Sequence, residues 1–394
     1  MKCLIRYSFY RHLGLSLCLV SGLATAQMDA DPEANVFDLQ GILGQAADPS
    51  FRQADPDYRM QFPQDHGLHP DFRNEWWYFT GHLEDEQQRA YGYQFTLFRL
   101  ALDAEEATEG NDHSLSTSHW RGRHMYMAHL ALSVPAEGRF IQEERFSRGA
   151  PGLAGAQVEP FSFWLYDWQL ETLHTGSEPP WRLQLKGDGF ALDLQLSNDA
   201  PGGKPRVLQG EQGYSRKGSA GASHYYSYPR LNTRGSLQLD GKTFPVKGNS
   251  WFDREWGSGA LGAHQSGWDW FSVQLDDGRD LMWYQLRLKS GGIDTASNGV
   301  LIASDGSTQS LSSQDISAEP SRHWHAPDGR CYPVAWQLNL ASESLQLEAL
   351  MPNQAWSGAF RYWEGAAAVH GSANGRAYVE LSGYPVVEQC PPLP

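Results

Sequence analysis

The sequence predicts an all-β protein that contains two related antiparallel units. Two observations lead to this fold class: large apolar residues alternate with smaller or polar ones in short runs, and a tryptophan-rich motif occurs twice. In addition, neither half contains a long segment with the 3.6-residue periodicity of an amphipathic helix. Short alternating strands separated by Gly, Asp and Pro turns are typical of antiparallel barrels and sandwiches.

The duplicated motif indicates that one unit was built twice. Residues 75–85 and 268–277 have the same order of aromatic, apolar and acidic positions, at an offset of 192 residues. The overlay pairs Trp76 with Trp268, Phe79 with Phe271 and Leu83 with Leu275, and at an offset of 191 residues it pairs 92–95 with 283–286. A repeat of this length predicts two copies of one β-rich unit.

The strand candidates follow one another through both halves of the chain. In the first half they are 91–98, 124–132, 161–166, 181–185, 190–196 and 236–239, and in the second half 268–275, 281–288, 299–303, 335–340, 345–349 and 377–381. The turns at 276–278 and 304–306 contain Asp-Gly and suit tight hairpins. A hinge is plausible at 231–235, although residues 243–256 fit either unit.

The first 26 residues have the features of a secretory signal peptide. Lys2, Arg6 and Arg11 precede the apolar stretch 13–23, which is followed by a small-residue cleavage site. This stretch is too short to span a membrane as a helix. We therefore expect cleavage between Ala26 and Gln27 and an exported protein, either periplasmic or secreted.

The mature chain is strongly acidic. Loss of the three basic residues in the signal peptide leaves 28 of 31 basic side chains against 46 acidic ones, so the formal charge changes from −15 to −18. This charge predicts repulsion from nucleic acid and excludes it as a partner. A peripheral association with the cell envelope stays compatible with the sequence. Residues 27–60 are expected to form an acidic leader with one short helix near 36–43.

Two cysteines remain after cleavage, Cys331 and Cys390. In an exported protein they can form one disulfide that ties the C-terminal tail to the second unit. The alternative is a pair of buried thiols, and the sequence does not decide between them.

The densest group of carboxylates and aromatic residues surrounds Asp253. If this segment is extended, Trp251, Asp253 and Glu255 face one side and the residues between them face the other. Carboxylates between aromatic rings can have raised pKa values, and a protonated carboxyl is a general acid at neutral pH. The alternative is a structural salt bridge from these carboxylates to Arg254 or Arg287.

Other candidate sites have weaker support. The first copy of the motif has one carboxylate beside its aromatic residues, Glu75, for which we expect a structural pair with Arg73 or Arg99. His323 and His325 face one side of a strand, which is a weak metal signal, and we predict no metal site. The sequence contains no nucleophile elbow, no zinc-protease motif, no phosphate loop and no dinucleotide fingerprint, so we predict no cofactor.

Several longer segments together resemble a known family. They are 62–70, 75–81, 251–257, 267–271, 362–366 and 375–381. In these segments the chain resembles the AttH-like secreted proteins, often called predicted secreted hydrolases, which are similar to bacterial carotenoid 1,2-hydratases. The resemblance covers roughly residues 58–386. It implies two lipocalin-like (calycin-type) antiparallel β-barrels and a role in lipid or isoprenoid metabolism.

The resemblance also implies a chemical role for the carboxylates, the hydration of a terminal isoprenoid double bond. This reaction needs an acid that can form a tertiary carbocation, aromatic faces that stabilise the cation, and a bound water. Asp253 or Asp269 is the candidate acid. Glu255 is expected to position the water, and His264 is a second proton carrier. The expected ligand contacts are Trp251, Trp256, Trp268, Trp270 and Tyr284, with Trp76, Trp77 and Glu75 from the first copy.

The sequence therefore predicts a leader (27–60), a first barrel (61–235) and a second barrel (236–394) that together handle a hydrophobic lipid, isoprenoid or carotenoid. The leading hypothesis is a carotenoid 1,2-hydratase-like lyase, and the alternative is a non-catalytic lipid carrier of the cell envelope. A hydrolase of esters or glycans would need a carboxylate pair across one cavity. The sequence leaves open whether the protein is an enzyme. Ion pairs for Asp253, Glu255 and Asp269 alike would count against catalysis.

Overall fold

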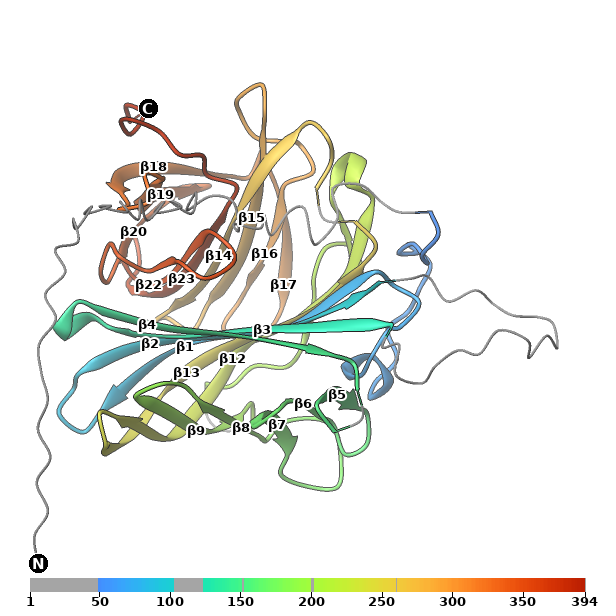
Figure 1. Cartoon of the computed structure of the whole chain (residues 1–394). Helices are drawn as coiled ribbons and strands as arrows, with labels where there is room; N and C mark the ends of the chain where they lie inside the picture. The colour runs from blue at the N-terminus through green and yellow to red at the C-terminus, as the bar shows by residue number, and fades with distance from the viewer. Residues whose placement is uncertain (1–48, 103–122, 151, 200–201, 260, 394) are drawn as a thin grey trace, which may run out of the picture. The chain divides into compact units, whose positions relative to one another are not determined.

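The computed structural model describes residues 49–102, 123–150, 152–199, 202–259 and 261–393 (Figure 1). All of these residues belong to one compact unit of the chain, Phe37–Pro394. The expected signal peptide and the expected short helix near 36–43 lie outside the described residues.

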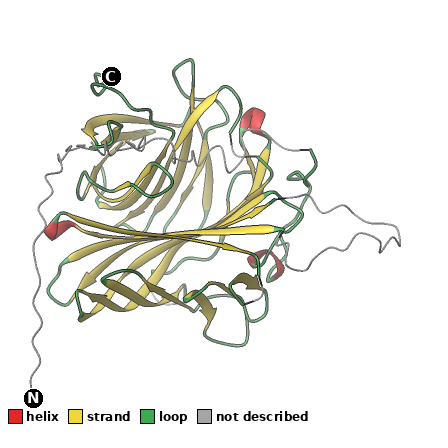
Figure 2. Cartoon of the chain, viewed as in Figure 1, coloured by secondary structure: helices red, strands yellow, loops and turns green. Residues whose placement is uncertain are grey.

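The regular secondary structure of the described residues is almost entirely β-strand, which confirms the predicted fold class (Figure 2). Their helices are three short 3₁₀ turns: η1 (Gln64–His66), η2 (Pro135–Glu137) and η3 (Gly218–Ala220). No helix in this part of the chain has the length and apolar character needed to cross a membrane.

The first sheet contains thirteen antiparallel strands and curls into a nearly closed barrel. Its strands are β1 (Asn74–Asp85), β2 (Ala90–Ala101), β3 (His124–Val134), β4 (Arg139–Arg148), β5 (Ala154–Gln157), β6 (Ser162–Leu165), β7 (Trp168–Thr172), β8 (Trp181–Lys186), β9 (Phe190–Ser197), β12 (Ala222–Leu239) and β13 (Lys242–Gly257), with β10 (Val207–Leu208) and β11 (Tyr214–Arg216) paired to β12. The order along the sheet is β4-β3-β2-β1-β13-β12-β9-β8-β7-β6-β5.

The second sheet contains ten antiparallel strands and forms a half-barrel. Its strands are β14 (Gln265–Leu275), β15 (Asp280–Leu288), β16 (Asn298–Ile302), β17 (Thr308–Ser312), β18 (Ile316–His325), β19 (Cys331–Leu340), β20 (Glu343–Ala349), β22 (Tyr362–Gly371) and β23 (Gly375–Ser382), with β21 (Ala355–Trp356) paired to β22. The order is β17-β16-β15-β14-β23-β22-β20-β19-β18. In Figure 1 this sheet lies on one side of β1–β4, and β5–β9 lie on the other.

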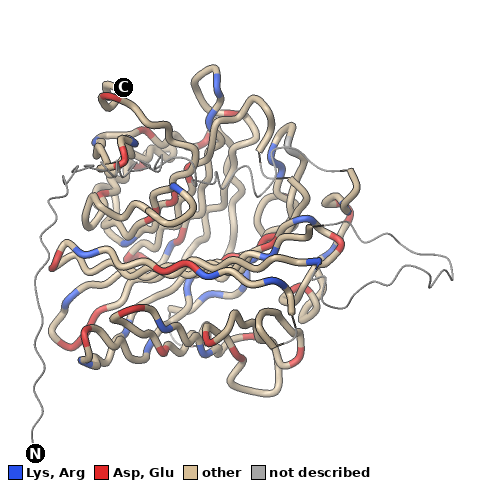
Figure 3. The backbone as a smooth tube through the Cα atoms, viewed as in Figure 1, with Lys and Arg blue, Asp and Glu red and all other residues tan. Residues whose placement is uncertain are grey.

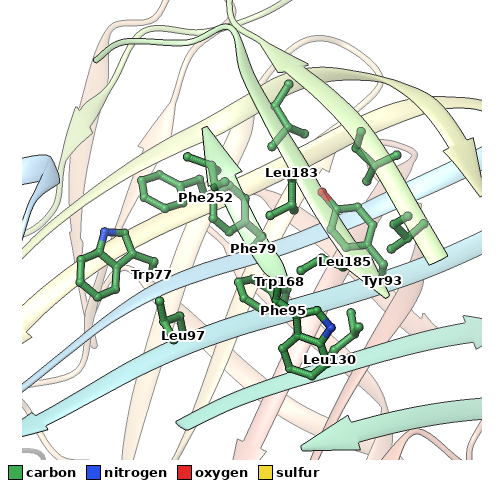
Figure 4. Packing of buried hydrophobic residues seen from close by; sticks show 14 of the residues in the cluster. Trp77, Phe79, Tyr93, Phe95, Leu97, Leu130, Trp168, Leu183, Leu185 and Phe252 are labelled. Carbon is green, nitrogen blue, oxygen red and sulfur yellow. The ribbon is translucent and has the colours of Figure 1, made fainter. Parts of the chain in front are cut away.

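The interior of the first sheet is filled by side chains. Phe79, Phe95 and Trp168 belong to a buried cluster that also includes Trp77 and Phe252 (Figure 4). These residues lie at alternate positions of their strands, because successive side chains of a strand point to opposite faces. Burial of so many aromatic rings, each of which removes a large apolar area from water, makes this barrel a packed core.

The second sheet has its own core on its concave side. Phe271, Trp283 and Trp336 are central members of this cluster. A disulfide joins Cys331 of β19 to Cys390, with their Cα atoms 5.4 Å apart, and so ties the C-terminal tail to the sheet.

The change from one sheet to the other falls between Gly257 and Gln265, and not after residue 235, where the sequence predicts the boundary between the two barrels. Residues 236–257 belong to β12 and β13, which pair with each other and with β9 and β1. The segment 231–235, considered as a hinge, lies inside β12, and its backbone pairs with both β13 and β9. A strand hydrogen-bonded on both sides cannot bend freely, so this segment is not a hinge.

The strand registers correct one part of the repeat overlay. Tyr78 of β1 lies opposite Thr96, and the equivalent Trp270 of β14 lies opposite Tyr284. Thr96, rather than Tyr93, is therefore the counterpart of Tyr284. The strands of the second hairpin are shorter, so an overlay that follows sequence similarity is out of register by an odd number of residues. An odd shift moves side chains to the other face of a sheet, and Tyr93 lies in the barrel core while Tyr284 does not.

Candidate functional site

The cavity that brings most of the candidate residues together lies between the two sheets, on the face of each sheet opposite its core. The space is about 860 Å³ when open solvent is counted, and about 100 Å³ of it can hold the centre of a water molecule. The first sheet and its loops contribute Trp76, Tyr78, Thr96, Phe98, Lys217, Tyr225, Asp253, Glu255 and Gly259, and the second sheet contributes Trp268, Trp270, Tyr284, Leu286, Tyr362, Glu364 and Glu380. This cavity therefore lies inside neither barrel.

Strand alternation places the two copies of the motif on this cavity. On β1, Trp76 and Tyr78 face the cavity while Trp77 and Phe79 face the barrel core. On β14, Trp268 and Trp270 face the same cavity while Phe271 faces the core of the second sheet. The first copy thus lines the wall that belongs to the first sheet, and the second copy lines the wall that belongs to the second sheet.

The predicted alternation along β13 is present. Phe252 and Trp256 lie in the core of the first barrel, whereas Asp253 and Glu255 line the cavity. Trp251 is on the cavity side but behind the wall, where its indole N–H donates to Asp253 at 2.7 Å.

Asp253 is held by neutral donors only. In addition to the bond from Trp251, it accepts a hydrogen bond from the Tyr225 hydroxyl at 2.8 Å and another from Ser227. Burial raises the pKa of Asp253 to about 7, although these hydrogen bonds oppose the shift by stabilising the carboxylate. The carboxyl is therefore available in both protonation states near neutral pH. The salt bridge to Arg254 or Arg287 that we considered for Asp253 is not formed.

Glu255 has a different environment from Asp253. Its carboxylate lies 3.1 Å from the ammonium of Lys217, which also lies 4.0 Å from the centre of the Tyr284 ring. Burial lowers the pKa of Lys217, but Glu255 and Tyr284 together outweigh this effect through charge and hydrogen bonding, and the pKa is raised. Lys217 therefore keeps its positive charge beside Glu255 in the cavity wall.

Two carboxyls of the second sheet, Glu364 and Glu380, were not identified as site residues from the sequence. Glu364 is fully buried, and its burial and the charge of Glu380 raise its pKa well above the usual value. Burial also raises the pKa of Glu380 to about 7, opposed by a hydrogen bond from Trp268. Both residues occur in segments of the family resemblance. The alternation of side chains along their strands, which also carry Tyr362 and Tyr378, shows which residues share a face. It does not show that this face lines a cavity, because the sheet opposite is distant in sequence.

Asp269, the second candidate acid, does not line the cavity. It lies on the other face of β14 and is buried, where it forms a salt bridge with Arg287. Gln285 and Tyr384 each donate a hydrogen bond to it at 2.9 Å. In this position it occupies the place that Trp77 has in the first sheet.

His264 and Glu75 are also placed away from the cavity. His264 is half exposed, and its Nε2 lies 2.9 Å from Asp294. Glu75 is buried in a salt bridge with Arg99, the pairing considered in the sequence analysis, at 2.6 Å and in a second one with Arg254. These contacts make Glu75 part of the end of the first barrel.

Trp77 and Trp256 lie in the same barrel end. The guanidinium of Arg254 lies 3.9 Å from the centre of the Trp77 ring. The imidazole of His69 stacks on Trp256 with ring centres 3.8 Å apart. Of the expected ligand contacts, Trp76, Trp268, Trp270 and Tyr284 line the cavity, and Trp77, Trp251, Trp256 and Glu75 do not.

Charged groups of both signs are distributed over the described backbone (Figure 3). Within the described residues, no group of three or more His, Cys, Asp or Glu side chains is arranged to hold a metal ion. The chemistry that the cavity offers comes from its carboxyls, its lysine and its aromatic rings.

Comparisons with known proteins agree with this architecture. The model of the AttH-like family matches residues 53–384. The crystal structure of a protein assigned to AttH from Nitrosomonas europaea is 34% identical, has a TM-score of 0.74, and covers 85% of this chain and 100% of that chain. Kievitone hydratase from Nectria haematococca has a TM-score of 0.62 over 86% of this chain and 97% of its own, but at 13% identity it is similar in fold alone. No curated protein matches the sequence.

Proposed function

Since the chain belongs to the AttH-like family, we propose that it is a hydratase-type lyase that adds water to a carbon–carbon double bond of an apolar molecule. The reaction takes place in the cavity between the two sheets. The observation that supports this proposal most directly is Asp253, a carboxyl that lines the cavity, forms no ion pair and has a pKa near 7.

Asp253 is the proton donor in this mechanism. Its protonated carboxyl transfers a proton to the less substituted carbon of the double bond, which leaves a positive charge on the more substituted carbon. A general acid works best when its pKa is near the working pH. The three groups that donate to Asp253 then stabilise the carboxylate that remains. A carboxyl held ionised in a salt bridge is a poor proton donor. Among Asp253, Glu255 and Asp269, only Asp253 forms no salt bridge, so Asp253 is the acid of the proposed mechanism.

The wall around Asp253 has groups that can stabilise the carbocation and position the water that adds to it. Trp76, Trp268 and Trp270 present aromatic rings, whose negative faces attract a cation. Glu255, paired with Lys217, offers carboxylate oxygens that can accept a hydrogen bond from a water. Water adds to the cationic carbon and loses one proton, which returns through the wall carboxyls to Asp253, so the enzyme ends in its starting state.

The substrate that we propose is a molecule with a terminal isoprenoid double bond, of the acyclic carotene type. Protonation of such a bond gives a tertiary cation, the kind that an acid of moderate strength can form with help from aromatic faces. Kievitone hydratase, which has this fold, is named for a hydration. We also propose that the protein is exported after cleavage near Ala26–Gln27.

A turnover assay tests the proposal. The purified protein is incubated with lycopene, an acyclic carotene, and hydrated product is measured by chromatography and mass spectrometry. We expect product from the wild type and from Asp305→Asn, an exposed control. We expect Asp253→Asn to lose at least about 100-fold of the rate. If the wild type forms no product but carries a bound lipid through purification, the carrier hypothesis replaces this one.

A further inference from the structure

The cavity wall carries more acidic than basic groups. Its carboxyls are those of Asp253, Glu255, Glu364 and Glu380. Among the described residues that line the cavity, only Lys217 has a positive charge, and that charge is paired with Glu255 at 3.1 Å. Three carboxyls therefore remain for which the lining provides no counter-ion.

Five aromatic side chains of the wall have their polar hydrogen engaged by an acceptor. The Trp268 indole donates to Glu380 at 2.9 Å, the Tyr78 hydroxyl donates to Glu364 at 2.6 Å and the Tyr225 hydroxyl donates to Asp253 at 2.8 Å. The Trp270 indole donates to the Tyr225 hydroxyl at 3.1 Å, and the Tyr284 hydroxyl donates to the backbone carbonyl of Arg216 at 2.9 Å. A bound carboxylate or phosphate would find these donors engaged, and a buried anion without donors is strongly destabilised.

The same wall favours a positive charge. Trp76, Trp268 and Trp270 present indole rings, and a cation within about 6 Å of such a ring is attracted by its face. Carboxyl oxygens on both sheets add a second attraction, which is strong because the site is largely shielded from water. Rings and carboxyls thus act in the same direction, and both act against an anion.

From this arrangement we propose that the cavity is selective for ligand charge: it binds an apolar molecule that carries one ammonium-type positive charge in preference to the neutral or anionic molecule of the same shape. This inference goes beyond the proposed hydration, because it concerns the charge of the molecule that binds before any reaction. It holds whether or not the protein catalyses a reaction. It also excludes fatty acids and phosphate-bearing lipids as natural ligands of this cavity.

The charge preference has a pH dependence with a defined sign. Asp253 faces Glu255 and Tyr225, Glu364 faces Glu380 and Tyr78, and Glu380 faces Glu255, whose own partner is Lys217. Burial raises the pKa of both Asp253 and Glu380 to about 7. A cation favours the ionised carboxyl, so its binding releases protons and strengthens as the pH rises toward and through 7. An anion would show the opposite trend.

Three matched probes test the proposal: geranylamine, geraniol and geranic acid, which share one isoprenoid chain and are cationic, neutral and anionic near neutral pH. Their dissociation constants are measured by isothermal titration calorimetry with the full mature chain, between about pH 6 and pH 8. We expect geranylamine to bind at least about tenfold more tightly than geraniol and geranic acid to bind most weakly. Repetition in buffers of different ionisation enthalpy measures the protons released with geranylamine.

Two variants connect the preference to the wall. Glu364→Gln and Glu380→Gln each remove a carboxyl without changing its shape, and we expect each to reduce the ratio of geranylamine to geraniol affinity. The control is Glu348→Gln, the same change at an exposed position of β20. Circular dichroism checks that each variant is folded, and if one is not, the pH dependence of the wild type carries the test.

Equal affinities for the three probes, or tightest binding of geranic acid, would overturn the inference. The outcome is independent of the turnover assay. A preference for geranylamine without any hydrated carotene would leave this inference standing and remove the proposed reaction. Hydration of the carotene without a charge preference would do the reverse.

Discussion

The hydroxyl of Tyr78 on β1 donates a hydrogen bond of 2.6 Å to the carboxyl of Glu364 on β22. The side-chain amide of Gln94 on β2 donates to the other oxygen of the same carboxyl at 2.9 Å. Both oxygens of a buried group in the second sheet are thus satisfied by the first sheet. This contact joins the two walls of the cavity and fixes the position of Glu364 within it.

Replacement of Tyr78 by Phe should weaken this junction. The change removes one donor from a buried carboxyl, so we expect the free energy of unfolding to fall by about 1–3 kcal/mol in urea denaturation. In the wild type the hydrogen bond from Tyr78 lowers the pKa of Glu364. Its loss in the variant should therefore raise this pKa further, which infrared spectroscopy of the carboxyl C=O stretch detects. Tyr166→Phe, which removes an exposed hydroxyl, is the control. Equal losses in both variants would contradict the assigned role of Tyr78.

Replacement of Glu380 by Gln should change how stability depends on pH. Folding raises the pKa of Glu380 from 4.5 to about 7, so its contribution is complete below the unfolded value and is lost as the pH rises through the folded value. The variant does not titrate at this position. Relative to the variant, the wild type should therefore lose up to about 3 kcal/mol of unfolding free energy between about pH 4 and pH 8. A difference that stays constant with pH would show that folding does not shift the pKa of Glu380, and Glu348→Gln provides the flat reference.

Replacement of Asp269 by Asn should affect stability first. The substitution leaves Arg287 without its ionic partner in a mostly buried place. Breaking such a pair on one side costs about 3 kcal/mol or more, which urea denaturation measures. A variant that keeps its stability and yet forms no hydrated product would restore Asp269 as a candidate acid, despite its position on the other face of β14.

The mature protein from the producing cell should begin at Gln27. Cleavage by a signal peptidase removes the positively charged and apolar N-terminus, and intact-mass spectrometry of the exported fraction reads the new end directly. The same spectrum, with and without reduction, should show the Cys331–Cys390 bond as a difference of two hydrogens. A full-length mass in the cytosolic fraction would refute export.

Much of the fold could be predicted from alternation and turns. Every strand expected from the sequence lies within or overlaps an observed strand, and the Asp-Gly turns at 276–278 and 304–306 connect β14 to β15 and β16 to β17. The strands that were not expected include β4 (Arg139–Arg148) and β18 (Ile316–His325), which carry many polar residues. Their burial pattern is weak because each lies at an edge of its sheet, and a weak pattern gives little signal in the sequence.

The candidate site could be predicted in part, from side-chain parity along single strands and from the tryptophan motif, as Trp76, Trp268, Trp270 and Tyr284 show. Alternation correctly separated Asp253 and Glu255 from Phe252 and Trp256, because parity along a strand is local. It could not show that Asp269 points into the second sheet's core side, or that Glu364 and Glu380 lie across from Asp253. Those relationships depend on which sheet packs against which, and this contact joins residues more than 100 positions apart. The partner of Glu255 was missed for the same reason: Lys217 lies in a loop and outside any motif.

On β1 and β14, neighbouring residues have different roles, because successive side chains point alternately to the core and to the cavity. Trp77 and Phe271 are constrained by the packing of their own cores. The side chains of Trp76, Trp268 and Trp270 are constrained instead by the molecule that occupies the space between the sheets. Ligand preference can therefore be redesigned, or drift in evolution, on one face of these strands while the other keeps the protein folded. Because the motif is duplicated, substitutions in either copy can change the lining of the same cavity.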